Sequence, residues 1–86
     1  MECKLSTHAQ QEMERRNIPL ALLESILNSP QQIIPAMSGT KAYQSKIDFG
    51  GGKIYLVRAI VNEDAFPPIV LTVYRTSKIE KYWRKS

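Results

Sequence analysis

The sequence predicts an α+β fold, with two N-terminal helices packed on a twisted antiparallel sheet of about four strands. In the first 30 residues, apolar side chains recur at three- and four-residue steps, as in an amphipathic helix. From residue 33 onward the chain instead has runs rich in β-branched and aromatic residues, separated by glycines and prolines. Neither a repeat nor a linker divides the chain, so we expect residues 1–86 to form a single domain.

Two helices are predicted before residue 30. Ser6 or Thr7 can cap the first helix, because a side-chain oxygen accepts from the free amides of the first turn, and this helix runs to about Arg16. Pro19 suits the first position of the second helix, where its missing N–H is not needed. The apolar stripe of the second helix consists of Leu20, Leu23, Ile26 and Leu27.

The strands follow in an order typical of an antiparallel meander. A short edge strand at residues 33–34 is interrupted by Pro35. Longer strands are predicted at residues 41–49, 53–61 and 69–75, with a triple-glycine hairpin at 50–52 and a loop at 62–68. The remaining residues form a short basic C-terminal helix or tail.

Composition excludes several classes of protein. Hydrophobic residues make up 43% of the chain, too many for a disordered segment, and no apolar run reaches the roughly 20 residues that span a membrane. The N-terminus lacks an apolar signal region, so we expect a cytoplasmic protein without a membrane partner. With one His and one Cys, a structural zinc site is not expected, and neither metal nor cofactor is predicted.

Positive charge is concentrated at the C-terminal end. Residues 71–86 carry five basic side chains against Glu80 alone, a net charge of +4 that equals the charge of the whole chain. Clustered positive charge indicates a phosphate-bearing partner such as RNA. A solubilising basic tail explains the same pattern equally well.

The only histidine lies at the border of the apolar face of the first helix. Helical spacing brings His8, Glu12 and Arg15 together on one side. An imidazole in that position can accept or donate a proton near neutral pH. Alternatively, His8 is partly buried and the other two side chains belong to a solvated charged face.

Three strand residues are candidates for a site. Arg58 shares the face of apolar neighbours in its own strand, which is costly unless the charge is paired or opens to a cleft. Thr72 and Tyr74 share a face with Val70, although both residue types also favour strands for their shape. We expect the ends of the chain to meet, so that His8 approaches Thr72 and Tyr74.

The chain resembles the DUF4258 family at both ends. The first helix with its histidine, the break after it and the end of the second helix match the opening of that family at His8, Met13, Arg16, Asn17, Ile18, Asn28 and Pro30. The run IVLTVYR, which contains Thr72 and Tyr74, is similar to the family's closing strand. The resemblance extends to the RelE-type toxins and to the wider group of barnase-like and colicin-type ribonucleases. It implies a site on the open sheet face, metal-independent cleavage of RNA and control by a partner antitoxin.

The reaction that fits these residue types is transesterification by a ribose 2′-OH. His8 is the candidate base or acid, Tyr74 its partner and Thr72 an orienting donor, while Arg58 or Arg16 stabilises the phosphate charge. The predicted substrate-binding residues are Arg15, Arg16, Lys46, Arg75, Lys81, Tyr82 and Arg84. Two alternatives stay open: a non-catalytic module that binds RNA or protein, and a toxin with a protein target. Dependence on the ribosome is also left open.

Overall fold

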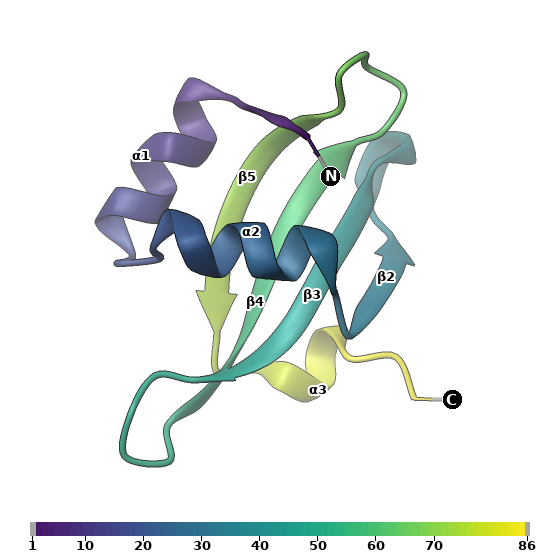
Figure 1. The fold of residues 1–86 in the computed structure, drawn as a ribbon. Helices are drawn as coiled ribbons and strands as arrows, with labels where there is room; N and C mark the ends of the chain where they lie inside the picture. Colours follow the sequence, from purple (N-terminus) through teal and green to yellow (C-terminus); the bar gives the residue numbers. More distant parts are fainter. Residues whose placement is uncertain (1, 86) are drawn as a thin grey trace.

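The computed structural model describes residues 2–85, which form a five-stranded sheet with helices on both sides (Figure 1). The elements in chain order are β1 (Lys4–Leu5), α1 (Thr7–Arg15), α2 (Leu20–Asn28), β2 (Gln32–Pro35), the 3-10 helix η1 (Met37–Gly39), β3 (Lys41–Asp48), β4 (Ile54–Asn62), β5 (Ile69–Thr76) and α3 (Ile79–Tyr82). The predicted α+β class is therefore confirmed, with both N-terminal helices and the C-terminal helix in place.

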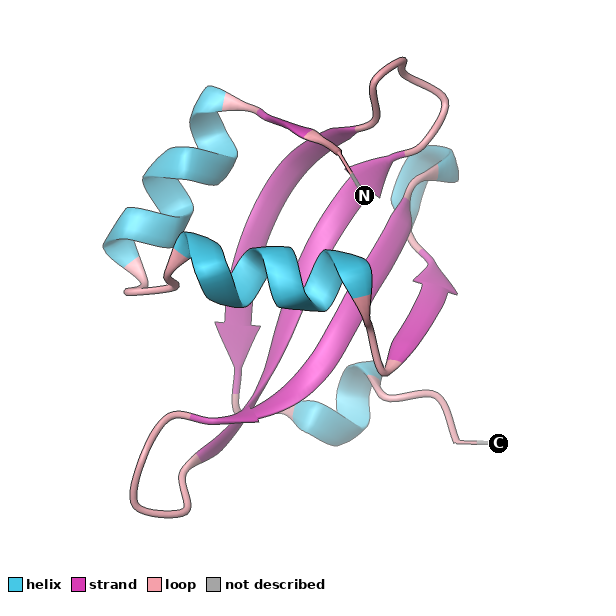
Figure 2. Ribbon diagram, viewed as in Figure 1, coloured by secondary structure: helices cyan, strands magenta, loops and turns pink. Residues whose placement is uncertain are grey.

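The strands lie in the order β1-β5-β4-β3-β2 (Figure 2). All neighbours are antiparallel except β1, which pairs in parallel with the start of β5. The prediction of about four antiparallel strands missed β1. Two residues are too few to show a period, and their pairing with Ile69 and Val70 connects distant parts of the chain.

Turn and cap residues explain where the elements begin and end. Ser6, rather than Thr7, caps α1: its hydroxyl accepts from the amide of Ala9 at 3.0 Å. The same hydroxyl donates to the carbonyl of Leu71 at 2.9 Å, which fixes the start of α1 to β5. The predicted glycine hairpin is confirmed, since residues 50–52 all have positive φ, which glycine adopts without strain.

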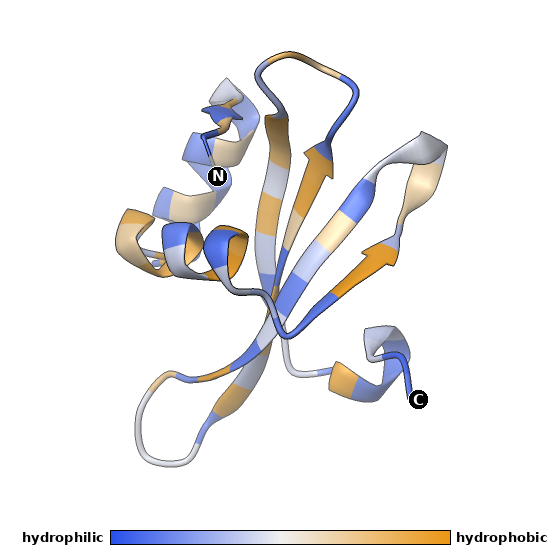
Figure 3. Ribbon diagram, turned by 45° about the vertical axis from the view of Figure 1, so that its right-hand side comes forward, coloured by the Kyte–Doolittle hydropathy of each residue, from blue (hydrophilic) through white to orange (hydrophobic). Residues whose placement is uncertain are grey.

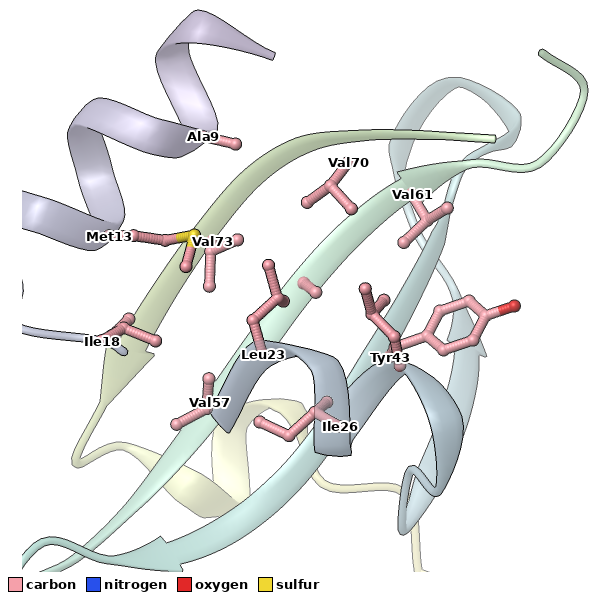
Figure 4. Close-up of a cluster of buried hydrophobic side chains, with 12 residues drawn as sticks. Ala9, Met13, Ile18, Leu23, Ile26, Tyr43, Val57, Val61, Val70 and Val73 are labelled. Carbon is pink, nitrogen blue, oxygen red and sulfur yellow. The ribbon is translucent and has the colours of Figure 1, made fainter. Parts of the chain in front are cut away.

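Helices α1 and α2 cover one face of the sheet with apolar side chains (Figure 4). Leu23 and Ile26 of α2 are fully buried over the centre of the sheet. Ala9 and Met13 of α1 pack beside Val73 of β5. We call this side the helix face; its strand residues include Tyr43, Val57, Ala59, Val61, Val70 and Val73.

The opposite side, which we call the open face, is covered only in part by α3 (Figure 3). Strand β5 changes sides within its length, because a β-bulge puts Leu71 opposite no residue of β4. As a result Val70 and Val73 both reach the helix face, whereas Leu71 is 37% exposed. The predicted strict alternation, with Val70 on the side of Thr72, is wrong for this reason.

Candidate functional site

A row of four polar side chains crosses the open face from one edge strand toward the other. Gln32, Gln44, Arg58 and Tyr74 are direct cross-strand partners on β2, β3, β4 and β5. Arg58 donates from Nη1 to the Tyr74 hydroxyl at 2.6 Å and from Nε to Oε1 of Gln44 at 2.8 Å. Gln44 then donates from Nε2 to Oε1 of Gln32 at 2.8 Å. The row is thus one continuous chain of hydrogen bonds.

The same row holds the C-terminal segment in place. Gln44 also donates to the carbonyl of Tyr82 at 3.2 Å. Gln32 pairs with the main chain of Arg84, donating to its carbonyl at 2.6 Å and accepting from its amide at 3.1 Å. The Tyr82 ring consequently lies 4.2 Å from the Arg58 guanidinium, and the Lys46 ammonium lies 4.1 Å from the Trp83 ring.

Arg58 is a buried cation without a carboxylate partner among residues 2–85. Its exposed fraction is 7%, and both ion pairs found in that part of the chain belong to Glu12 on the other side of the sheet. A guanidinium has five N–H donors, and only two are used by Gln44 and Tyr74. Burial of an unpaired charge costs free energy, which an incoming anion would offset.

Arg58 lines a pocket of about 570 Å³, within the usual range for ligand sites. Strands β4 and β5 form its floor, and η1 and α3 form its walls. The lining residues are Ala36, Met37, Ser38, Thr40, Arg58, Ile60, Leu71, Thr72, Tyr74 and Tyr82. An anion in this pocket would be met by guanidinium and phenol groups together.

Another pocket, of about 460 Å³, lies on the helix face between β1 and α2. Its lining includes four leucines, with Lys4 as its cation and two glutamates, Glu2 and Glu24. Lys4 is exposed, so its charge is already hydrated and creates no demand for a ligand. The pocket on the open face is therefore the stronger candidate.

The two tyrosines of the open-face pocket differ in acidity. Burial raises the pKa of the Tyr74 phenol, against the opposing effect of Arg58. Lys81 lowers the pKa of the Tyr82 phenol, and Arg58 adds to this effect. Their rings meet edge to face, with centroids 6.3 Å apart. Environments that separate the pKa values of two neighbouring groups are typical of an acid and a base.

The structure brings three of the four predicted catalytic residues to the pocket, namely Arg58, Thr72 and Tyr74, and it does not bring His8. Helix α1 does lie against β5, as expected, but it packs on the side of Val73. Thr72 and Tyr74 face the other way, and His8 is exposed on α1. His8 therefore does not join the site that we expected the two ends of the chain to share.

The predicted substrate-binding residues divide between the two sides of the sheet. Arg15 and Arg16 lie on α1, where both donate to the carboxylate of Glu12, at 2.8 Å and 3.3 Å in the closest contacts. Arg75 is opposite Val57 on the helix face and stacks on Phe49 at 4.3 Å. The residues that lie around the open face are Lys46, Lys81, Tyr82 and Arg84.

Sequence reasoning missed the two glutamines and the apolar rim of the pocket. Gln44 is completely buried, which is unusual for an amide side chain. One signal was available: Gln44 falls on the same side of its strand as Ala42, where a core residue would be expected. The pairing of Gln44 with Arg58 depends on the register of β3 and β4, which no local pattern specifies.

A family model described as a domain of unknown function, DUF4258, matches residues 5–75. The chain belongs to the DUF4258 family. The match runs from Leu5 in β1 to Arg75 in β5 and so includes the strand residues on the floor of the open-face pocket, but it ends before α3 and Tyr82. The family has no known function, so only the residues of the site indicate the chemistry of this DUF4258 domain.

No curated protein and no solved structure is significantly similar to the chain. Within residues 2–85, no helix is long and apolar enough to cross a membrane. In the same part of the chain, no three His, Cys, Asp or Glu side chains are grouped as a metal site would need.

Proposed function

We propose that this DUF4258 domain is an endoribonuclease that cleaves RNA by transesterification in the open-face pocket, without a metal. The observation that carries the proposal is Arg58, a buried guanidinium with free donors and no carboxylate partner among the described residues. A planar guanidinium binds phosphate oxygens in a bidentate manner. Two phenols with oppositely shifted pKa values, Tyr74 and Tyr82, lie against it.

The proposed reaction exchanges one phosphate ester for another. The ribose 2′-oxygen attacks the adjacent phosphorus while Tyr82, once deprotonated, accepts its proton as the base, and the bond from phosphorus to the 5′-oxygen breaks. Tyr74 donates its proton to that leaving oxygen while its hydroxyl accepts from Arg58. The products are a 2′,3′-cyclic phosphate and a 5′-hydroxyl.

Arg58 stabilises the charge that develops on the phosphate oxygens. A preorganised donor of this kind is typically worth about 10²–10³ in rate. Thr72 lies beside Tyr74 in the pocket and orients the phosphate through its hydroxyl. Lys46, Lys81 and Arg84 attract the neighbouring phosphates of the strand, whereas His8, Arg15 and Arg16 have no part in the reaction.

A relation to RelE-type toxins is part of the proposal and adds a partner. An antitoxin would inhibit by covering the open-face pocket and shielding Arg58. Such a partner would be expected to present a carboxylate there, because Arg58 has none within the described chain.

A non-catalytic RNA-binding module is the second candidate. The position of His8 outside the pocket favours it, since binding requires only the cation and the aromatic rings. Base stacking on tyrosine together with phosphate contacts would be sufficient for single-stranded RNA. The two functions differ in whether the phosphodiester is broken.

The test is incubation of the purified 86-residue protein with a defined single-stranded RNA in the presence of a chelator. We expect products that end in 2′,3′-cyclic phosphate, and resistance of a substrate with 2′-deoxyribose at the cleaved position. Arg58→Gln should lower the rate of product formation about 10²–10³-fold and Arg16→Gln should retain the wild-type rate. Cleavage of the deoxy substrate would reject the mechanism, and binding without cleavage would support the binding module.

A further inference from the structure

The open-face pocket has a polar half and an apolar half. Arg58 and Tyr74 are cross-strand partners in one row, and Ile60 and Thr72 are partners in the next row. The rows are two residues apart along each strand, a distance of about 6–7 Å. The polar half therefore adjoins an apolar half without an intervening wall.

The apolar half is lined by large apolar side chains of the kind usually found in a protein core. Ile60 lies on its floor, with Met37 of η1 and Leu71 of β5 beside it. Met37 is 84% exposed and Leu71 is 37% exposed. Leu71 reaches this side of the sheet only because of the β-bulge. Bulges commonly redirect a side chain next to a functional site.

The two halves match the two ends of a nucleotide. A phosphate at Arg58 would leave the attached ribose and base to extend over Ile60 toward Met37 and Leu71. The hydroxyls of Ser38, Thr40 and Thr72 border the same half and can meet the polar edges of a base. A free phosphate would use only one half of the pocket.

We propose that the apolar half binds one nucleobase of single-stranded RNA, unpaired and unstacked from its neighbours. This inference rests on the proposed function, because it assumes that the anion at Arg58 is an RNA phosphate. A base that enters a pocket between η1 and α3 cannot remain paired, so duplex RNA is excluded as a substrate. The domain thereby selects single strands by shape rather than by sequence.

Calorimetric titration with cytidine 3′-monophosphate, adenosine 3′-monophosphate and inorganic phosphate tests the inference on the intact chain at fixed salt. We expect the mononucleotides to bind at least about tenfold more tightly than inorganic phosphate, because the base adds its own contacts. Equal affinities, or no binding of the mononucleotides, would overturn the inference.

Variants of the exposed rim separate the two halves. Met37→Ala and Leu71→Ala should each weaken mononucleotide binding about three- to tenfold and leave phosphate binding unchanged. Phe66→Ala is the matched control, since this apolar side chain is fully exposed in a loop and lies outside the pocket lining. Arg58→Gln should weaken both ligands. Rim variants that weaken both ligands equally, or neither, would contradict a base-binding half.

The binding titrations and the RNA cleavage assay can fail separately. If mononucleotides bind with the expected preference and RNA is not cleaved, the base-binding half stands and the nuclease proposal fails. If RNA is cleaved and a duplex is cleaved as fast as a single strand, the nuclease proposal stands and the inference fails.

Discussion

Both faces of the sheet bury apolar side chains, such as Leu56 on the open face, but the open face also buries a cation and an amide. On the helix face, Leu23 and Ile26 pack on valines and alanines of the strands, and each buried group is apolar or small. On the open face, the buried residues include Gln44 and Arg58, which depend on hydrogen bonds to each other. Apolar burial stabilises a fold directly, whereas burial of a cation costs free energy that its hydrogen bonds recover only in part.

This difference indicates where function lies. A domain of 86 residues has a small core, to which a buried cation at position 58 contributes less than a fully apolar pair of side chains would. We propose that a ligand, and not stability, accounts for the guanidinium at that position. The helix face therefore maintains the fold and the open face is available for binding.

The largest effect on stability is expected on the helix face. Leu23→Ala removes a fully buried side chain between α2 and the sheet and should lower the free energy of unfolding by about 2–5 kcal/mol. Urea denaturation measures this loss, with Leu20→Ala as a control, because Leu20 is 53% exposed. A loss below about 1 kcal/mol would mean that the helices contribute little to the fold.

Arg58→Met is the counterpart on the open face. The substitution removes the buried charge but also leaves Oε1 of Gln44 without its donor, so the two effects oppose each other and stability should change by less than about 1 kcal/mol. RNA binding, followed by fluorescence anisotropy, should be lost in the same variant. A marked loss of stability would show that Arg58 is a structural residue and would weaken the contrast between the two faces.

Gln44→Leu should have an intermediate effect. It leaves the Nε–H of Arg58 without an acceptor and the carbonyl of Tyr82 without a donor, at a cost of about 1–3 kcal/mol. Tyr82 should also move away from the guanidinium, so RNA affinity should fall along with stability. Gln11→Leu, on the exposed surface of α1, is the control for the substitution itself. Unchanged affinity would mean that the position of α3 is irrelevant to binding.

Lys81→Met should change the pH dependence of phenolate formation and of cleavage, and leave the free energy of unfolding unchanged. Lys81 lowers the pKa of Tyr82, so its loss should raise that pKa and move the formation of phenolate to higher pH. If Tyr82 is the base, the alkaline rise in cleavage rate should move in the same direction. Ultraviolet absorbance follows the phenolate, and Lys78→Met provides the control. Phenolate formation that shifts without a shift of the rate profile would exclude Tyr82 as the base.

The smallest effect is expected at Glu12 on α1. Hydrogen bonds from Arg15 and Arg16 lower its pKa from 4.5 to about 2. Because the folded state lowers this pKa, the stabilisation is complete above pH 4.5 and is lost as the pH falls toward 2. Glu12→Gln should remove that part of the acid dependence and leave RNA binding unchanged, with Glu14→Gln as control. An altered RNA affinity would mean that α1 takes part in the site.

Much of the fold could be predicted because its signals are local. The change from helical to strand period, the cap at Ser6 and the glycine hairpin are all written within a few neighbouring residues. The parallel β1 strand could not be predicted, because it has two residues and its partner lies 65 positions away, at Ile69.

The site was predicted only in part, for a related reason. Arg58 and Tyr74 were found because a charged and a phenolic side chain interrupt apolar strands. Tertiary packing decides which face of the sheet α1 covers. The residue type and helical position of His8 could therefore not show that it lies outside the pocket. The contribution of Gln44 likewise depends on strand register.

The central claim is that function resides in the open-face pocket and not on α1. The most direct measurement compares the rate of cleavage of one defined RNA by the wild-type protein, by Arg58→Gln and by His8→Ala. We predict that Arg58→Gln lowers the rate about 10²–10³-fold and that His8→Ala retains the wild-type rate. Loss of activity in His8→Ala with full activity in Arg58→Gln would contradict the account.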